Sequence, residues 1–412
     1  MAERTQREYD VVLFGATGFT GGLTAEYLAG AATGTRWALA GRDQAKLEAA
    51  RERLTELDPA AGSLSLLKAD IGDPDSIRRV AEAARVVITT VGPYIHYGEP
   101  LVAACAAAGT DYVDLTGEPE FVDLMWLRYQ EQAVRSGARL VHSCGFDSIP
   151  HDLGALYTVG LLPEGVPLKV EGFVRASGGI SGGTYHSAVH IMARLRQTRR
   201  VAAQRRKREG RPEGRTIKAI TGVPRHDGTA GGWVLPVPTI DPIVVLNSAR
   251  ALARYGPEFS YGHYLVAKRL GMLAGFAAGA GTVAALAQLP PTRNLLLKLK
   301  DPGDGPSAEQ RQKAWFRVRF HGQAGEPLGI QPRGNGSGRS HRPDEGRQVV
   351  TEVSGGDAGY QESSKMLAES ALCLAHDDLP ERAGQLTTAV AMGQSLIDRL
   401  QRAGIDFRTV ES

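Results

Sequence analysis

The stretch VVLFGATGFTGG, residues 11–22, decides the fold of this 412-residue chain. A short apolar strand is followed by glycines at positions 15, 18 and 21, which open a helical sequence. The first glycine allows a tight turn, the second lets backbone approach a pyrophosphate, and the third lets the helix pack on the sheet. The helix N-terminus then offers N–H groups to the phosphates. The stretch therefore predicts a dinucleotide-binding turn.

Strand-like and helix-like runs alternate through the first 145 residues. This alternation implies right-handed crossovers and a parallel sheet with helices on both faces. Six strands is the number in a doubly wound nucleotide-binding domain, so we predict a Rossmann-like α/β domain over residues 1–150. The predicted strands are 11–14, 37–40, 64–67, 86–90, 112–115 and 140–142, and the predicted helices include 43–57 and 119–136.

The pattern changes after Pro150, and residues 151–412 predict a second, mixed α+β domain. We expect its sheet to cover the cofactor cleft. Residues 325–346 are rich in Gly, Arg and Pro and predict a mobile loop. The other predicted elements are a strand at 168–174, a helix from Tyr185, a pair of strands at 315–320 and 348–353, and closing helices within 361–402, at 366–375 and 385–402.

The end of the second strand indicates which dinucleotide binds. An NAD enzyme usually has a carboxylate there, whereas an arginine receives the 2′-phosphate of NADP. Arg42 can bind a phosphate with two parallel hydrogen bonds and Lys46 adds a second charge, which favours NADP(H). Asp43 either caps the next helix or meets a ribose. The predicted cofactor-binding residues are Gly15, Thr17, Gly18, Phe19, Thr20, Gly21, Arg42, Lys46, Asp70, Val91, Gly92 and Pro93.

Three side chains near the ends of later strands are candidates for catalysis. Tyr94 follows the Gly92-Pro93 turn and either donates a proton to substrate or packs on the cleft wall. Asp147 and His151 follow the sixth strand: Asp147 either acts in catalysis or caps the following helix, and His151 is either a proton donor or a capped loop histidine. Glu118 is a weaker candidate. His186 and His190 share a helix face but lack a third ligand at metal spacing, so we predict no metal.

Composition excludes several classes of protein. A net charge of +3 and the lack of an aromatic-basic pattern argue against nucleic-acid binding. Three separated cysteines do not support a disulfide framework and are typical of a reducing cytosol. The charged N-terminus runs directly into the first strand, so we expect no signal peptide and a cytoplasmic location.

Two segments of the second half leave alternatives open. Residues 194–218 carry eleven Lys and Arg, which form a solvated face, a dock for an acyl carrier, or a contact with anionic lipid. Residues 270–289 have no charge and are long enough to span a bilayer. A buried or substrate-lining helix, a helix on the membrane surface and a true span are the three interpretations. The location would then be cytoplasmic or peripheral to the plasma membrane.

Longer motifs resemble a known family. GATGFTG, AGR at 40–42, TTVGPY at 89–94, YVDLTGE at 112–118 and SCGFDSIPHDLG at 143–154 are similar to saccharopine dehydrogenase-like oxidoreductases, in the branch with the actinobacterial trans-acting enoyl reductases. TEVSGGDAGYQESSKMLAESALCLA and GQLTTAVAMG are similar to the same branch. The resemblance implies a Rossmann-like domain, a second α+β domain and NADP-linked reduction. Some members are associated with membranes or lipid droplets, and residues 325–346 have no counterpart.

We therefore expect an NADP(H)-dependent oxidoreductase of lipid metabolism or glycolipid biosynthesis. Its substrate would be a hydrophobic or acyl-carrier-bound lipid or polyketide intermediate with an unsaturated carbon. A dinucleotide-binding scaffold at a membrane, with little catalysis, is the alternative. True saccharopine dehydrogenase activity would need basic groups for several carboxylates, which the apolar segment argues against. A second copy of the chain and an anionic membrane surface are further candidate partners.

Overall fold

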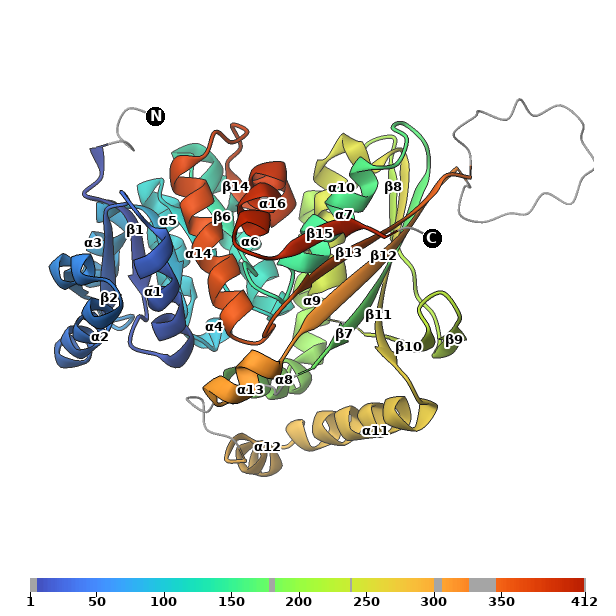
Figure 1. Cartoon of the computed structure of the whole chain (residues 1–412), viewed down its shortest axis with the longest axis horizontal. Helices are drawn as coiled ribbons and strands as arrows, with labels where there is room; N and C mark the ends of the chain where they lie inside the picture. Colours follow the sequence, from blue (N-terminus) through green and yellow to red (C-terminus); the bar gives the residue numbers. More distant parts are fainter. Residues whose placement is uncertain (1–5, 178–181, 238, 300–305, 326–345, 411–412) are drawn as a thin grey trace, which may run out of the picture.

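The computed structural model describes residues 6–177, 182–237, 239–299, 306–325 and 346–410 and has two sheets side by side (Figure 1). The first is the predicted parallel Rossmann-like sheet, which the structure confirms. Within the described residues its strand order is β14-β6-β5-β4-β1-β2-β3. Its strands are β1 (Tyr9–Phe14), β2 (Trp37–Gly41), β3 (Ser65–Lys68), β4 (Ala84–Thr89), β5 (Asp111–Asp114), β6 (Arg139–Val141) and β14 (Gly384–Leu386).

Both faces of this sheet are buried. Val11 and Leu13 of β1 belong to one apolar cluster, whereas Val12 and Phe14 belong to the cluster on the opposite face. A strand covered on both sides needs a continuous apolar run, which explains the sequence pattern. The covering helices are α1 (Phe19–Ala31), α2 (Gln44–Leu57), α3 (Pro74–Ala83), α5 (Glu99–Ala108), α6 (Pro119–Ser136) and α14 (Gln361–His376).

The C-terminal part of the chain returns to the first sheet. Residues 385–386, predicted as the start of a helix, instead lie in β14, which pairs in parallel with β6. Gln130 of α6 accepts a hydrogen bond from the Gln385 backbone at 2.7 Å and holds this three-residue strand at the edge. So short a strand has no periodicity to detect. The division of the chain near residue 150 stays a prediction, with α14 and β14 packed on the first sheet.

The second sheet is mixed, as predicted for an α+β domain. Its order within the described residues is β15-β13-β12-β7-β11-β10-β9, and β8 pairs with β11. The expected pairing of the two late strands is confirmed, because Phe316 of β12 faces Gly355 of β13 in an antiparallel ladder. The strands are β7 (Leu168–Ala176), β8 (Thr216–Ala219), β9 (Arg225–Asp227), β10 (Gly232–Pro236), β11 (Glu258–Ala267), β12 (Phe316–Ala324), β13 (Gln348–Gly355) and β15 (Asp406–Thr409).

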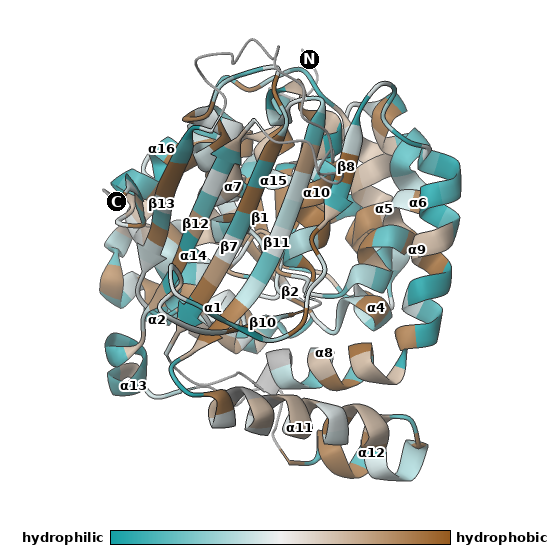
Figure 2. Ribbon diagram, turned by 90° about the vertical axis from the view of Figure 1, so that its right-hand side faces the viewer, coloured by the Kyte–Doolittle hydropathy of each residue, from teal (hydrophilic) through white to brown (hydrophobic). Residues whose placement is uncertain are grey.

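Helices α7 (Ile149–Gly160) and α10 (Asp241–Ala251) pack against the inner face of this sheet, and Figure 2 shows the outer face open. The remaining helices are α4 (Tyr94–Tyr97), α8 (Gly182–Ala193), α9 (Leu195–Glu209), α11 (Leu270–Ala287), α12 (Pro290–Leu297), α13 (Ala308–Lys313), α15 (Thr388–Ala391) and α16 (Gly393–Arg402). The loop predicted as mobile, 325–346, lies almost wholly outside the described residues.

Two expectations for the second half are revised by the structure. The reading of 270–289 as a buried helix is wrong, because only 6% of α11 is buried. The basic stretch 194–218 is not simply a solvated face, since some of its arginines form ion pairs with carboxylates of α6. Arg194 pairs with Glu120 and the buried Arg205 pairs with Asp123 of α6 at 3.0 Å.

Candidate functional site

A cavity of about 1360 Å³ lies beyond the carboxyl ends of β1 and β4. The strand order reverses between these two strands, and open α/β sheets bind ligands at such a switch point. The volume exceeds the range of about 300–1000 Å³ that is usual for small-molecule sites. The cavity therefore has room for a dinucleotide together with a second molecule.

The glycine turn forms the floor of the cavity. Gly15 has a φ of +90°, and a Cβ on Gly21 would lie 2.1 Å from the carbonyl oxygen of Gly15. These two positions need glycine for the turn and for the close packing of α1. A Cβ on Gly18 would meet protein only at 3.5 Å, so packing does not require this glycine. Gly18 instead leaves space for a ligand at the N-terminus of α1, and the turn fits a pyrophosphate.

The residues predicted to bind the cofactor line this cavity, with the exception of Lys46. Arg42 follows β2 at the rim and is exposed, as a 2′-phosphate partner must be. Asp43 accepts a hydrogen bond from the Lys46 backbone at 3.1 Å and caps α2, so the capping reading of Asp43 holds. Asp70 accepts from the Gly72 backbone in a turn at the same rim.

Tyr94 lies on the cavity wall with its hydroxyl turned into the backbone. The hydroxyl donates to the Thr89 carbonyl at 3.1 Å and accepts from the Leu115 amide at 3.2 Å. Burial raises the pKa of Tyr94 well above its ordinary value. Both sides of the hydroxyl are thus engaged, which favours the packing role over proton donation for this residue.

Glu118 was a weak candidate in the sequence but is central to the geometry of this loop. Its buried carboxylate accepts from the backbone amides of Tyr94 and Ile95 at 3.0 and 2.9 Å. It also accepts from the hydroxyl of Ser187 on α8 at 3.1 Å. Burial raises the pKa of Glu118, while the two amides oppose the rise. Glu118 therefore ties the loop after β4 to α8.

Asp147 projects into the cavity from the loop after β6. Its side chain is accessible from the cavity, and its carboxylate lies close enough to Gly117 that a Cβ there would approach Oδ2 to 3.3 Å. Desolvation by the cavity walls raises the pKa of Asp147 to about 6, although the side chain itself is accessible from the cavity. The negative charge of Asp241 adds to the rise and His151 opposes it. Asp147 is the group here best suited to hold a proton near neutral pH.

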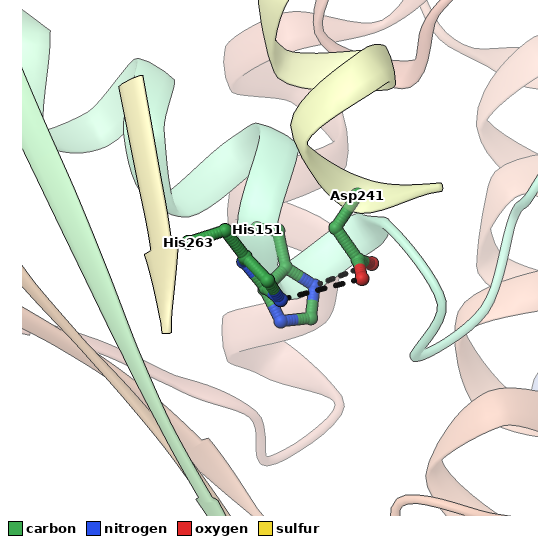
Figure 3. A group of neighbouring side chains, drawn as sticks. All are labelled: His151, Asp241 and His263. Carbon is green, nitrogen blue, oxygen red and sulfur yellow. Dashed lines mark ion pairs between the residues drawn. The ribbon is translucent and has the colours of Figure 1, made fainter. Parts of the chain in front are cut away.

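His151 does not line the cavity but forms a buried cluster with Asp241 and His263 (Figure 3). Its Nδ1 is 3.1 Å from Oδ1 of Asp241, and Nε2 of His263 is 3.5 Å from Oδ2. Burial lowers the pKa of His263 to about 4, so this imidazole is neutral at pH 7. Burial opposes the charge on Asp241, but the two histidines outweigh it and keep the pKa of this carboxyl below its ordinary range.

The same three side chains are a geometric candidate for a metal ion. Their donor atoms lie within 4.8 Å of one another, and imidazole and carboxylate are donors that zinc accepts. Oδ2 of Asp241 already accepts from the hydroxyl of Thr239, and Oδ1 faces His151. Groups of the chain itself thus already surround both oxygens of this carboxylate. The absence of a metal stays a prediction.

The cover of the cavity comes from α8 and from loops, whereas the sequence suggested the second sheet. No strand residue of that sheet lies among the described lining residues. Ser363 at the start of α14 accepts from the Phe146 amide at 3.1 Å and so fixes the loop that carries Asp147. The lining residues outside the predicted set include His96, Tyr97, His186, Ile191, Met192, Ile240 and Ser363. The five from His186 onward lie far from the nucleotide-binding motifs in the sequence.

Comparison with known proteins agrees with this architecture. Residues 11–141 match the saccharopine dehydrogenase NADP binding domain. The chain is 35% identical over 433 residues to a trans-acting enoyl reductase of Mycobacterium tuberculosis, with 98% of each chain covered. It is 34% identical to a trans-acting enoyl reductase of Mycobacterium ulcerans, with 97% of each covered. The fold is similar to that of saccharopine dehydrogenase (L-Glu forming) from Saccharomyces cerevisiae, with a TM-score of 0.51, 11% identity and coverage of 98% and 100%.

The glycine turn, the parallel sheet and these full-length relatives all indicate one family of nucleotide-dependent enzymes. The NADP-binding domain identifies the cofactor as NADP(H). The chain is an oxidoreductase and belongs to the trans-acting enoyl reductases within the saccharopine dehydrogenase-like family.

Proposed function

We propose that this protein reduces the carbon–carbon double bond of an enoyl group in a lipid or polyketide intermediate. Enoyl reduction requires a hydride at one alkene carbon and a proton at its neighbour. NADPH supplies the hydride when it is bound. The names of the relatives support the enoyl substrate class, and the cavity supports a substrate beside the cofactor.

The observation that carries the proposal is the position of Asp147 in the cavity. With a pKa of about 6, about one tenth of this carboxyl is protonated at pH 7, against less than a hundredth for an ordinary aspartate. Asp147 can thus deliver a proton at the cavity surface. The charges of His151 and Asp241 act on its pKa, so we assign His151 a positioning role.

The cofactor would be held by the glycine turn and the N-terminus of α1, with Arg42 at the 2′-phosphate end. Val91, Gly92 and Pro93 would form the adjacent wall. Apolar side chains of α8, Ile191 and Met192, face the same cavity. These walls suit a hydrophobic substrate better than one with several carboxylates, which would need basic groups.

The test is reduction of enoyl thioesters, followed as loss of NADPH absorbance. Asp147→Asn removes the proton and should lower the rate by about 100-fold or more, while NADPH affinity stays unchanged. Asp378→Asn, at an exposed aspartate outside the cavity, is the matched control and should keep full activity. An active Asp147→Asn enzyme would remove Asp147 from the mechanism.

The alternative function is a dinucleotide-binding scaffold with little catalysis. It predicts normal NADPH binding and no turnover of acyl-carrier-bound or free enoyl substrates by the wild-type protein. The same assay therefore separates the two proposals. Measurement of NADPH binding by fluorescence shows whether an inactive preparation is folded.

A further inference from the structure

Helix α11 and helix α12 form an apolar hairpin that the described residues cover only on the side facing α8. Among the described residues α11 is the one helix long and apolar enough to cross a membrane, with a mean hydropathy of 1.7. Figure 2 shows it below the body of the protein, next to α8 and α12. A helix that is apolar on all sides is normally buried in a core or in lipid. The described residues bury only 6% of α11, so most of its apolar surface is open to a partner.

The hairpin carries a large share of the exposed apolar side chains of the protein. Six of the fourteen large apolar side chains exposed in the described residues lie between positions 270 and 299. A grouping of this kind marks an interaction surface, whereas single exposed apolar residues do not. The six are Leu270, Met272, Leu286, Leu289, Leu295 and Leu299.

The charges around the hairpin have one sign. Residues 259–299 contain no Asp or Glu, but Lys268 and Arg269 precede α11, and Arg293 and Lys298 lie in or beside α12. None of these four cations is ion-paired with a carboxylate that the structure describes. An apolar surface bordered by free cations complements an anionic bilayer, in which lipid tails accept the leucines and headgroups accept the cations.

The chain connections decide between a surface helix and a membrane span. β11 leads into α11 from the second sheet, and α13 and β12 return to the same sheet after residue 306. A span would place residue 288 across the bilayer and would need a second span to return. α12 has only eight residues, and about twenty are needed for a span. α11 therefore fits the interface plane, parallel to the membrane.

We propose that the α11–α12 hairpin docks this protein on the surface of an anionic phospholipid bilayer. The inner side of the hairpin packs on α8, where Val189 contacts Ala287 and Leu296 in one buried cluster. Gln288 donates to the Met192 carbonyl at 2.8 Å across the same contact. Because other residues of α8 line the cavity, docking places the apolar wall of the cavity next to the lipid.

The experiment is flotation of the purified full-length protein with vesicles of phosphatidylcholine containing 30% phosphatidylglycerol. Leu286→Glu with Leu289→Glu should lower the floated fraction at least tenfold. Leu57→Glu with Val134→Glu, at exposed apolar positions on α2 and α6, is the matched control and should float as the wild type does. Lys298→Glu should weaken binding about fivefold or more. The charge-matched control is Arg79→Glu on α3, which is exposed on the other domain.

Three results would overturn the proposal. The first is that the wild-type protein stays at the bottom of the gradient with anionic vesicles. The second is that the double Glu variant floats as the wild type does. The third is a dimer in light scattering that the same double variant dissociates, because the hairpin would then face a second copy. Vesicle binding is measured without substrate, so its outcome is independent of the proposed reductase activity.

A second readout links docking to the substrate, and it rests on the proposed function. The double Glu variant should raise KM for a long-chain enoyl ester embedded in vesicles but leave turnover of a short, soluble enoyl thioester unchanged. A wild-type enzyme inactive on both substrates contradicts the reductase proposal alone. Equal KM values for the two proteins on the embedded ester would contradict delivery of substrate from the bilayer.

Discussion

At the scale of single residues, the proton on Asp147 makes a prediction about pH. Desolvation by the cavity walls raises its pKa to about 6, so the protonated form dominates below pH 6 and falls about tenfold per pH unit above it. If this proton is delivered in the rate-limiting step, kcat/KM should decline with the same slope between pH 6.5 and 8.5. Initial rates at saturating NADPH and varied substrate concentration give kcat/KM at each pH. A flat profile over this range would assign the proton to another group.

Arg42 makes a second prediction at the same scale. It lies at the cavity rim where the 2′-phosphate of NADP is expected, whereas Asp43 is engaged in capping α2. Arg42→Ala should weaken NADPH binding by about 10- to 100-fold, because a charge-assisted pair with phosphate is lost. NADH binding should change little. Lys46→Ala, just outside the cavity lining, is the comparison in the same fluorescence titration, and equal losses for both nucleotides would refute the assignment.

At the scale of elements, Asp152 links three distant segments. From α7 its carboxylate accepts from the Thr388 hydroxyl at 2.7 Å and the Ala389 amide at 2.8 Å, and Ser248 of α10 donates to the other oxygen. Asp152→Ala would leave these buried donors without an acceptor and should cost on the order of 3 kcal/mol of unfolding free energy. Urea unfolding measures the cost.

Hydrogen exchange places the loss of stability in particular elements. In the Asp152→Ala protein the amides of α15, and then those of the adjacent β14, should lose protection first, since Asp152 holds α15 to α7. Asp398→Ala on α16, whose partner Gln394 is exposed, is the control and should change stability by less than about 0.5 kcal/mol. Loss confined to other elements would show that Asp152 does not organise this region.

The elements also show what the sequence could predict. Strands β1 to β6 are predictable because each is a short continuous apolar run, and helix α6 because it has a clear start at Pro119. β14 was missed because three residues at a sheet edge have no period and depend on Gln130. For helix α11 the sequence leaves a buried helix, a surface helix and a span open, because composition alone cannot tell a core helix from one that faces lipid.

The site was predictable only in part, for a related reason. The glycine turn and Arg42 are local signals, with each residue a few positions from a strand end. The bracing role of Glu118 and the lining by Ile191 and Ser363 depend on contacts between segments far apart in the chain, such as Phe146 and Ser363, which are 217 residues apart. His263 had no signal at all, because its partners His151 and Asp241 lie on two other elements.

At the scale of the whole molecule, the return of α14 and β14 to the first sheet couples the two sheets. α14 packs against α1 and β4, next to the glycine turn, and the chain then continues to β15 in the second sheet. A ligand bound at the turn should therefore stabilise both sheets together. NADPH at 100 times its Kd adds about 2.7 kcal/mol. For a chain of this length that corresponds to a rise in Tm of about 3 °C.

Differential scanning calorimetry tests this coupling. We expect a single transition that NADPH shifts as a whole, in the wild type and equally in Asp147→Asn, because Asp147 is proposed to act in the reaction and not in cofactor binding. Arg42→Ala at the same NADPH concentration should show a clearly smaller shift. Two resolved transitions, of which NADPH moves only one, would mean that the sheets unfold independently and that α14 does not couple them.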